Sequence, residues 1–285
     1  MKGIILAGGS GTRLYPTTLS ISKHLLPVYN KPMIYYSLSV LMLCKFKEVI
    51  LICDPDSKEQ YKKIFNDGRH LGMKIHIIVQ KDANGIPDAF LISKKYINNE
   101  NVCLMLGDNF FFGQGFYQIL KKGTNLKKGA FFLGYNVQDP KKYAVLETKG
   151  NKIISIVEKP EKPKTNLAVP GIYFFDKKVI SYCKKLVKSE RGELEIVDLI
   201  KIYLNENQAK FEEIGRGISW LDMGSFDDLN ECSNYIRAIE KRQNFLIGSL
   251  EEIALLNKWI SKRKINLIAK EYNNSYGDYL KKLCL

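Results

Sequence analysis

The chain has 285 residues, with 44 Lys and Arg against 30 Asp and Glu, which gives a formal net charge of +14. A hydrophobic share of 45% with 26% charged residues is typical of a globular protein with a substantial core, and it excludes disordered and collagen-like chains. No run of about 18 apolar residues is present, and Met1-Lys2 leads directly into a short apolar run. We therefore expect neither a membrane helix nor an export signal.

The charge surplus is almost entirely lysine, because only seven of the 44 basic residues are arginine. The lysines are scattered as single residues and pairs, such as Lys62-Lys63 and Lys121-Lys122. Arginine is the residue that most often reads bases and phosphates, so this pattern favours a solvated surface. Binding of a nucleic acid and binding of an anionic substrate remain alternatives.

The six cysteines are far apart and form no C-x-x-C pair, and the three histidines lack the spacing of metal ligands. We therefore expect reduced thiols in a cytoplasmic protein rather than disulfides or a zinc site. A hydrolase centred on histidine is disfavoured for the same reason.

Over about the first 130 residues, short apolar runs alternate with helical patterns. The predicted strands are Lys2–Ala7, Glu48–Cys53, Lys74–Val79 and Val102–Leu106. Three helical segments are predicted between them: one begins at Pro32, a second ends at Phe65, and a third spans residues 87–96. Strands that are apolar at every position bury both faces, so this pattern indicates a parallel sheet covered by helices on both sides.

After about residue 131 the pattern changes to strands joined by turns, over residues 143–147, 152–158 and 168–175. This indicates a mixed or antiparallel extension of the sheet. A helix is predicted over 193–205, and Ser225 with Asp228 forms a capping box that begins another. The chain from about residue 243 is expected to form lysine-rich helices.

A glycine-rich segment follows the first strand directly. It reads Gly8-Gly9-Ser10-Gly11-Thr12-Arg13-Leu14. It is not a Walker A loop, which needs Gly-Lys-Ser/Thr, and Leu14 stands where a dinucleotide-binding fingerprint needs its third glycine. Three glycines beside hydroxyl and basic side chains let backbone N–H groups approach an anion. We therefore predict a phosphate-binding loop.

Further motifs follow this segment in order along nearly the whole chain. They are Pro16-Thr17, Ser22-Lys23-His24-Leu25-Leu26-Pro27, Gln80, Leu106-Gly107-Asp108-Asn109, Val157-Glu158-Lys159-Pro160, Arg191-Gly192-Glu193-Leu194-Glu195, Trp220-Leu221-Asp222 and Gly277-Asp278-Tyr279-Leu280. In this order the chain resembles the sugar-1-phosphate nucleotidylyltransferases, and within them the glucose-1-phosphate thymidylyltransferase branch.

The resemblance implies a Rossmann-like α/β nucleotidyltransferase fold, with a mostly parallel central sheet flanked by helices, a small mixed or antiparallel sugar-binding extension and C-terminal helices. It implies a catalytic domain over residues 1–242, with a nucleotide-binding part over about 1–130 and a sugar-binding part over about 131–225. Residues 243–285 would form a helical appendage for oligomer contacts and an effector.

The activity implied is transfer of a nucleotidyl group from dTTP to glucose 1-phosphate with Mg²⁺, giving dTDP-glucose and pyrophosphate, a first step toward dTDP-deoxysugars such as dTDP-rhamnose. A phosphate monoester is already mostly ionised at neutral pH, so it needs no general base. That suits a chain with only three histidines. Positioned cations and Mg²⁺ would stabilise the charge that leaves on pyrophosphate.

The resemblance also implies roles for individual residues. Nucleotide binding is predicted for Leu6, Gly8, Gly9, Ser10, Gly11, Thr12, Arg13, Lys23, His24, Gln80, Gly85 and Asp108. Sugar-phosphate binding is predicted for Ala144, Glu158, Lys159, Val169, Gly171 and Arg191. Asp108 and Asp222 would hold the metal, and with Arg13, Lys23 and Lys159 they form the predicted catalytic set.

The family's short enzymes imply a homotetramer with feedback by a dTDP-sugar, and no nucleic-acid or membrane partner. Leu256 and Gln114 depart from the pattern of that effector site. Ala144 replaces a usual glycine in the sugar pocket, and Pro87-Asp88 departs from the pattern near the base. A related enzyme using UTP or another hexose 1-phosphate therefore remains an alternative, as does a non-catalytic protein that binds sugar nucleotides or nucleic acid.

Overall fold

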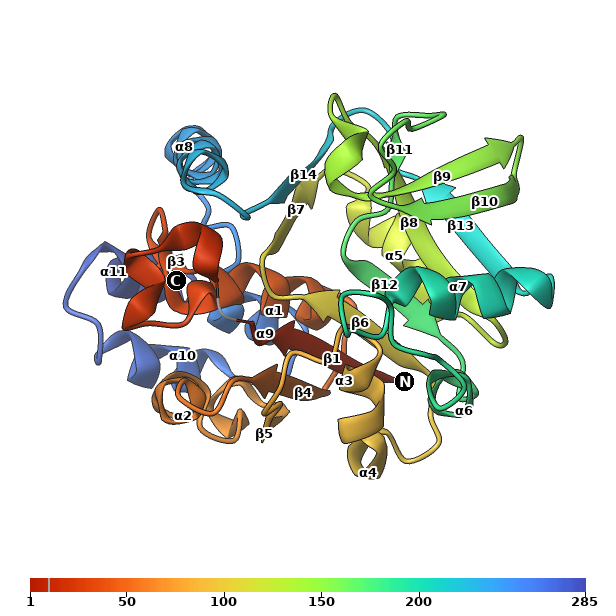
Figure 1. Cartoon of the computed structure of the whole chain (residues 1–285). Helices are drawn as coiled ribbons and strands as arrows, with labels where there is room; N and C mark the ends of the chain where they lie inside the picture. Colours follow the sequence, from red (N-terminus) through yellow and green to blue (C-terminus); the bar gives the residue numbers. More distant parts are fainter. Residues whose placement is uncertain (10) are drawn as a thin grey trace.

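A ten-stranded sheet runs through the middle of the molecule in the computed structural model, which describes residues 1–9 and 11–285 (Figure 1). Its strand order is β10-β9-β11-β8-β12-β6-β1-β4-β5, and β13 pairs with β8 beside this path. The predicted fold class, a mostly parallel sheet flanked by helices with a mixed extension, is confirmed.

The parallel part of the sheet contains the four strands predicted from continuous apolar runs. They are β1 (Lys2–Ala7), β4 (Glu48–Cys53), β5 (Lys74–Val79) and β6 (Val102–Leu106), each with the predicted bounds. In register, Ile4 of β1 lies opposite Ile50 of β4 and Leu104 of β6. All four strands run the same way, so their carboxyl ends meet at one edge of the sheet, where ligands bind in open α/β sheets.

The mixed part of the sheet begins where β12 pairs antiparallel with β6. Its strands are β8 (Ala130–Asn136), β9 (Ala144–Lys149), β10 (Lys152–Glu158), β11 (Leu167–Ala168), β12 (Ile172–Phe175) and β13 (Ala209–Glu213). The prediction of one strand over residues 168–175 is wrong, because the chain leaves the ladder at Pro170, which has no N–H to donate.

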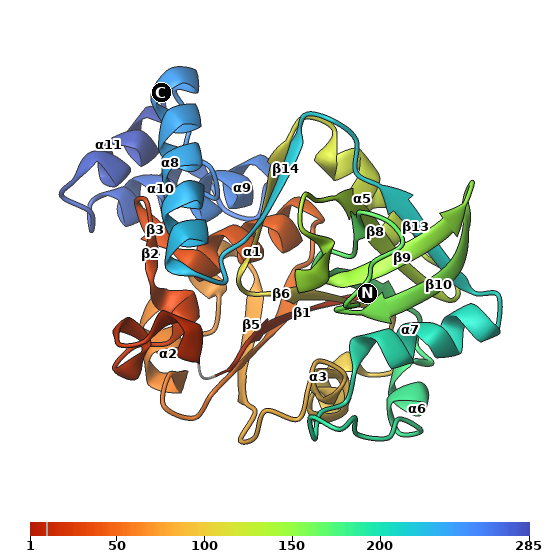
Figure 2. The same cartoon turned by 45° about the horizontal axis from the view of Figure 1, so that its top comes forward.

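Four further strands lie outside the main sheet. β7 (Asn109–Gly113) pairs antiparallel with β14 (Ile218–Asp222), and β2 (Pro27–Val28) forms a small hairpin with β3 (Lys31–Pro32). Figure 2 shows β7 and β14 crossing between the mixed part of the sheet and α8. This two-stranded connection places Asp222 beside the end of β6.

The helices flank the sheet and extend past one side of it. They are α1 (Met33–Leu43), α2 (Lys58–Phe65), α3 (Asp88–Ile92), α4 (Lys94–Ile97), α5 (Phe116–Thr124), α6 (Val179–Cys183), α7 (Ile196–Asn205), α8 (Phe226–Gln243), α9 (Leu250–Leu256), α10 (Lys262–Ala269) and α11 (Ser275–Lys282). Five short 3-10 turns complete the set, at Thr12–Leu14, Thr17–Leu19, Lys23–Leu25, Arg69–Leu71 and Pro140–Lys142.

Three predicted helix boundaries need correction. Pro32 has ψ 143° and precedes α1 as its N-cap rather than opening it. The helix predicted over 87–96 is divided at Ser93 into α3 and α4. Glu195 is extended, so α7 starts at Ile196. The predicted capping box of α8 is confirmed, since the Ser225 hydroxyl accepts the Asp228 N–H at 3.2 Å.

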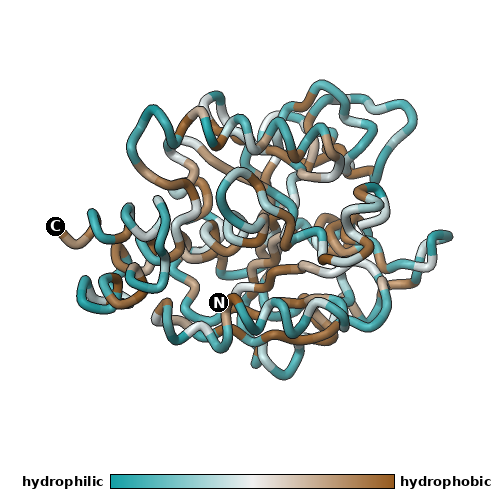
Figure 3. Tube along the Cα trace, turned by 90° about the vertical axis from the view of Figure 1, so that its left-hand side faces the viewer, coloured by the Kyte–Doolittle hydropathy of each residue, from teal (hydrophilic) through white to brown (hydrophobic). Residues whose placement is uncertain are grey.

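The sheet buries an apolar core on each face (Figure 3). One core packs α1, α2, α5 and α9 against the sheet, with Leu38, Phe65 and Ile253 among its members. The other packs α3, α6 and α7, with Phe90 and Tyr203. Covered faces explain why the central strands are apolar at every position. No helix in the described residues has the length and apolarity needed to cross a bilayer.

Candidate active site

The glycine-rich segment lies at the carboxyl ends of the parallel strands, immediately after β1. Gly9 has φ 113° and Gly11 has φ 59°, which are conformations that residues with a Cβ rarely adopt. Ser10, predicted to bind nucleotide, lies outside the described residues. Three successive 3-10 turns then bring the chain to Lys23. The glycines thus allow the backbone to reverse and return a basic side chain to the strand ends.

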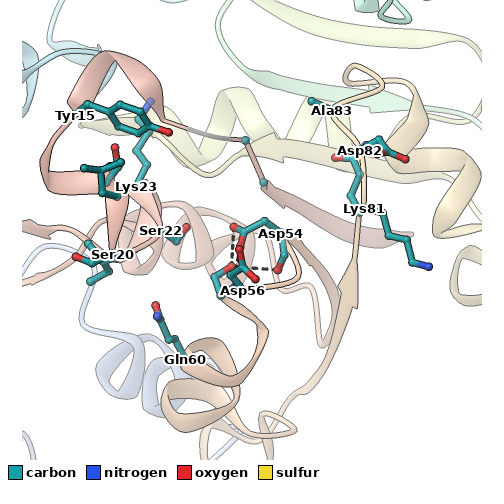
Figure 4. A pocket seen from close by; sticks show the side chains of 17 residues that line it. Tyr15, Ser20, Ser22, Lys23, Asp54, Asp56, Gln60, Lys81, Asp82 and Ala83 are labelled. Carbon is teal, nitrogen blue, oxygen red and sulfur yellow. Dashed lines mark hydrogen bonds between the residues drawn. The ribbon is translucent and has the colours of Figure 1, made fainter.

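A cleft of about 440 Å³ opens beside this segment. Four residues predicted to bind nucleotide line it, namely Gly8, Gly9, Lys23 and Gln80. Figure 4 shows Lys23 and Tyr15 on one side, Lys81, Asp82 and Ala83 on the other, and Asp54 and Asp56 between them. We call this space the nucleotide-side cleft.

A second cleft, of about 230 Å³, lies toward the mixed part of the sheet. Its walls contain every residue predicted for sugar-phosphate binding, namely Ala144, Glu158, Lys159, Val169, Gly171 and Arg191. Arg13, Asp108 and Asp222 line it as well. We call this space the sugar-side cleft. Residues from β9, β10, the segment after β11 and the start of α7 therefore converge, although the chain separates them by up to about fifty positions.

Lys23 and Asp108 form an ion pair where the two clefts meet. The Lys23 ammonium donates to Asp108 Oδ2 at 2.5 Å. Burial alone would raise the pKa of Asp108, but the charges of Lys23 and His24 and the hydrogen bonds from Lys23 and Asn109 outweigh it, so the pKa of Asp108 lies below its usual value. Asp108 is therefore a carboxylate at neutral pH.

Asp222 lies beside this ion pair because β14 pairs with β7 and the Met223 N–H donates to the Asp108 carbonyl at 3.0 Å. Burial and the charge of Asp108 raise the pKa of Asp222 to about 6. A Cβ built on Gly224 would lie 3.3 Å from Arg13 Nη1 and 3.5 Å from Asp222 Oδ2. The guanidinium and this second carboxylate therefore occupy the same region.

His24 packs behind the ion pair rather than in a cleft wall. It is 4% exposed, and a Cβ on Gly107 would lie 2.7 Å from His24 Cδ2. Its Nδ1 has no hydrogen-bond partner among residues 1–9 and 11–285. Burial lowers the pKa of His24 to about 4, so the ring is neutral at neutral pH. Leu6, Gly11 and Thr12 also lie outside the walls of both clefts.

Gly85, predicted to contact the base, touches the sugar side of the molecule. It pairs with Leu194 as an isolated parallel bridge, and the Leu194 N–H donates to the Asn84 carbonyl at 2.8 Å. A Cβ on Gly85, where φ is 93°, would lie 2.1 Å from the Leu194 carbonyl oxygen. The position therefore requires glycine, and it joins the edges of the two clefts.

Two cations and two carboxylates form the outer end of the sugar-side cleft. Glu158 Oε1 lies 3.8 Å from Lys159 Nζ and 3.9 Å from Arg191 Nη2. Arg191 Nη2 also contacts Glu195 Oε1 at 3.0 Å. Burial, helped by the charge of Glu195, raises the pKa of Glu158. Lys159 has φ 41°, an uncommon conformation for a residue with a Cβ, and such strain is concentrated at functional sites.

Asn109 is a site residue that the sequence reasoning missed, although it stands in a quoted motif. Its Oδ1 accepts the Gly171 N–H at 2.9 Å and the Trp220 indole N–H at 2.7 Å. Its Nδ2 donates to Asp108 Oδ1 at 2.9 Å. The buried amide of Asn109 therefore positions Asp108, a candidate metal ligand. It also fixes Gly171 and Trp220, which line the sugar-side cleft. Tyr143 also lines this cleft, and no local pattern indicated it.

The pair of aspartates fits Mg²⁺ but not a metal held by protein ligands alone. Within the described residues, no group of three or more His, Cys, Asp or Glu side chains could hold a metal ion. Mg²⁺ is usually bound by one or two carboxylates together with substrate phosphates. Asp108 and Asp222 could supply such carboxylates, and phosphates could enter from the adjoining clefts.

Two polar clefts thus adjoin at Lys23, Asp108 and Asp222, at the carboxyl edge of an α/β sheet. The chain belongs to the nucleotidyl transferase family, whose sequence profile matches residues 2–238. The resemblance to nucleotidylyltransferases seen in the sequence is confirmed, and so is the prediction that the chain is an enzyme of this class.

Curated relatives carry a narrower name. A glucose-1-phosphate thymidylyltransferase of Neisseria meningitidis is 45% identical over 285 residues, covering 99% of each chain. One of Mycobacterium tuberculosis is 42% identical, again over 99% of each chain. A solved structure from Bacillus anthracis superposes with a TM-score of 0.78 at 37% identity, over 86% of this chain and 97% of that chain.

A more distant structure shows the extent of the fold. A UDP-glucose pyrophosphorylase complexed with UDP-glucose superposes with a TM-score of 0.73 at 23% identity, over 85% of this chain and 99% of the other. At that identity the likeness concerns the fold alone.

Proposed function

We propose that the chain transfers the thymidylyl group of dTTP to glucose 1-phosphate, releasing pyrophosphate and forming dTDP-glucose. The observation that supports this most strongly is the meeting of two polar clefts at Lys23, Asp108 and Asp222. The named relatives act on the same substrates by their descriptions. Formation of dTDP-glucose would be a first step toward dTDP-deoxysugars.

The reaction needs no protein nucleophile. An oxygen of the sugar phosphate attacks the α-phosphorus of dTTP, and the bond from that phosphorus to the oxygen bridging to the β-phosphate breaks. Lys23 would hold the α- and β-phosphates, and Arg13 would bind the departing β- and γ-phosphates. Each positioned cation stabilises charge that develops on the leaving group. One such group typically raises the rate by about 10²- to 10³-fold, which corresponds to several kcal/mol of transition-state stabilisation.

Asp108 and Asp222 would hold Mg²⁺ between the substrates. When bound, the ion supplies positive charge at the phosphate oxygens and aligns them for in-line displacement. The ammonium of Lys23 pairs with one of these two carboxylates, that of Asp108. Burial and the charge of Asp108 hold the pKa of Asp222 above its ordinary value.

At the outer end, Lys159 and Arg191 would bind the phosphate of the sugar, and the planar guanidinium suits two-point contact with phosphate oxygens. Glu158 would accept hydrogen bonds from sugar hydroxyls, with the backbone at Ala144, Val169 and Gly171 beside it. The fit of the hexose depends on the Ala144 methyl, since this residue forms part of the wall.

An activity panel tests the proposal. Each nucleoside triphosphate is incubated with glucose 1-phosphate, galactose 1-phosphate or mannose 1-phosphate and Mg²⁺, and pyrophosphate release is measured. The proposal requires the highest turnover with dTTP and glucose 1-phosphate. A maximum with UTP or another hexose would establish the related transferase instead, and no turnover with any pair would favour a binding protein.

Three further expectations accompany this function. A homotetramer and feedback by a dTDP-sugar follow from the resemblance. Light scattering tests the homotetramer, and pyrophosphate release with and without dTDP-rhamnose tests the feedback. A cytoplasmic location accords with six free thiols, five of which are buried. Salt-sensitive binding of duplex DNA would contradict the expectation that the lysine surplus is only a solvated surface.

A further inference from the structure

The side chain of Gln80 is held in one orientation at the end of β5. Its Nε2 donates to Asp88 Oδ2 at 2.8 Å. A carboxylate oxygen can only accept a hydrogen bond, whereas an amide has one donating and one accepting end. The NH₂ end of Gln80 must therefore face Asp88, and its oxygen must face away.

The opposite end of the Gln80 amide points toward the glycine-rich segment. Gln80 Oε1 lies 3.6 Å from the position that a Cβ on Gly8 would occupy. Gly8 and Gln80 both line the nucleotide-side cleft. The cleft is therefore presented with a hydrogen-bond acceptor, not a donor, at this point of its wall.

Both partners of this hydrogen bond are anchored by their backbones. The Gln80 N–H donates to the Cys53 carbonyl at 2.9 Å, which continues the β4–β5 pairing. Asp88 is the first residue of α3, after Pro87, and the next two residues, Ala89 and Phe90, are fully buried. Neither backbone can shift without disturbing the sheet or the core, so the orientation is built into the fold.

We infer that Asp88 is a positioning residue that makes this chain select nucleotides whose pyrimidine has an imide N–H, through the orientation it imposes on Gln80. The inference rests on the proposed function only in assuming that the base lies against Gln80. Thymine and uracil donate from N3, which Gln80 Oε1 can accept. Cytosine accepts at N3, so two acceptors would face each other in a partly desolvated cleft.

The selection concerns one edge of the base and nothing else. UTP and CTP share their ribose and triphosphate, so a comparison between them isolates this edge. Thymine and uracil have the same imide, so Asp88 does not distinguish dTTP from UTP. A binding site rejects a ligand that leaves buried polar groups unpaired far more strongly than a ligand that only lacks a methyl group. The difference in affinity between UTP and CTP should therefore be measurable.

The test measures binding of UTP, dTTP and CTP, each with Mg²⁺, by isothermal titration calorimetry. Three variants are compared with the wild-type chain. Asp88→Asn keeps the shape but offers either a donor or an acceptor, so Gln80 is free to turn. Asp88→Lys offers donors only, so Gln80 must present its NH₂ end to the base. Asp67→Asn removes an exposed carboxylate outside both clefts and is the matched control.

We expect the wild-type chain and Asp67→Asn to bind UTP and dTTP at least about tenfold more tightly than CTP. Asp88→Asn should lose most of this preference, and Asp88→Lys should reverse it. A merely structural role for Asp88 would weaken all three nucleotides equally and leave their ratios unchanged. Circular dichroism and thermal unfolding identify any variant that fails to fold, and Asp88→Asn alone suffices for the decision.

Two results would overturn the inference: equal binding of UTP and CTP by the wild-type chain, or an unchanged preference in folded Asp88→Asn. Pyrophosphate release measured on the same samples separates it from the proposed function. If the wild-type chain transfers nothing but shows a base preference that depends on Asp88, the proposed function fails and the inference stands.

Discussion

Two lysines only eight positions apart along the chain, Lys23 and Lys31, each form an ion pair with a carboxylate. The two ion pairs differ in their exposure to solvent and in how many hydrogen-bond partners the carboxylate has. In the pair of Lys31 with Glu240 the atoms are 3.0 Å apart, and the side chains are 2% and 3% exposed. Glu240 also accepts the Ile247 N–H at 2.8 Å and the Asn30 amide at 2.7 Å. Every oxygen of this carboxylate has a protein partner.

The pair of Lys23 with Asp108 is more open, and further charged side chains lie beside it. Its side chains are 9% and 20% exposed, and Asp222 adds a second carboxylate beside it. A saturated pair joins the β2–β3 hairpin to α8 and has no capacity left for a ligand. The pair of Lys23 with Asp108 is partly exposed where the clefts meet, so its charged groups remain accessible. The contrast distinguishes an ion pair that holds the fold from one that we propose is available to substrates and metal.

Asp108→Asn should have the largest effect, and the effect should be on activity. Loss of the carboxylate removes the proposed metal ligand and the partner of Lys23, so we expect turnover to fall by about 10³-fold or more. Pyrophosphate release measures this, with circular dichroism to show that the fold persists. Near-wild-type turnover would mean that the metal assignment is wrong.

Lys31→Met should instead act on stability. It leaves Glu240 buried without its cation, which typically costs about 3–5 kcal/mol in the free energy of unfolding. Urea unfolding measures the loss. The double variant Lys31→Met with Glu240→Leu removes both charges and should recover part of it. A loss below about 1 kcal/mol in the single variant would show that this pair is not the tighter of the two.

Asp222→Asn should stabilise the metal-free chain near pH 7 by about 1–3 kcal/mol while abolishing turnover. The pKa of Asp222 is raised to about 6 by folding, so the folded state binds more protons than the unfolded state between about pH 4 and 6. Stability contributed by this group therefore falls as the pH rises through that window. Thermal unfolding with a chelator from pH 4 to 7 should show this fall in the wild-type chain and not in the variant.

Ser225→Ala should have the smallest effect. α8 begins four residues after Asp222 and contains Glu240 near its end, so it connects the neighbourhoods of both pairs. Removing the hydroxyl that caps the helix should cost about 1 kcal/mol in the free energy of unfolding. Ser249→Ala is a suitable comparison, because Ser249 precedes α9 without a side-chain hydrogen bond that caps that helix. Equal losses in the two variants would contradict the importance of the cap.

The elements that could be predicted from sequence are those whose signal is local. The strand bounds of β1, β4, β5 and β6 were correct because each is a continuous apolar run with clear ends. The cap of α8 was correct because Ser225 and Asp228 are three residues apart. By contrast, β13 pairs with β8 across about eighty residues and has a mixed burial pattern, which gives no local signal.

The site shows the same division. The glycine-rich segment and the two aspartates are recognisable as motifs, whereas the amide of Asn109 becomes important only when Gly171 and Trp220 are folded against it. The bond from Gln80 to Asp88 is only eight positions long, but a departure from the family pattern at Asp88 does not reveal which atom it faces. The pairing of Lys31 with Glu240, 209 positions apart, has no sequence signal.

The contact of Gly85 with Leu194 has a consequence for redesign of the enzyme. The loop predicted to contact the base and the segment that carries Arg191 meet there without room for a single methyl group. A variant built to accept a bulkier sugar by lengthening residues 189–195 will displace Asn84 and Gly85 as well. Donor and acceptor preferences therefore cannot be altered independently on this side of the protein, and libraries should vary both segments together.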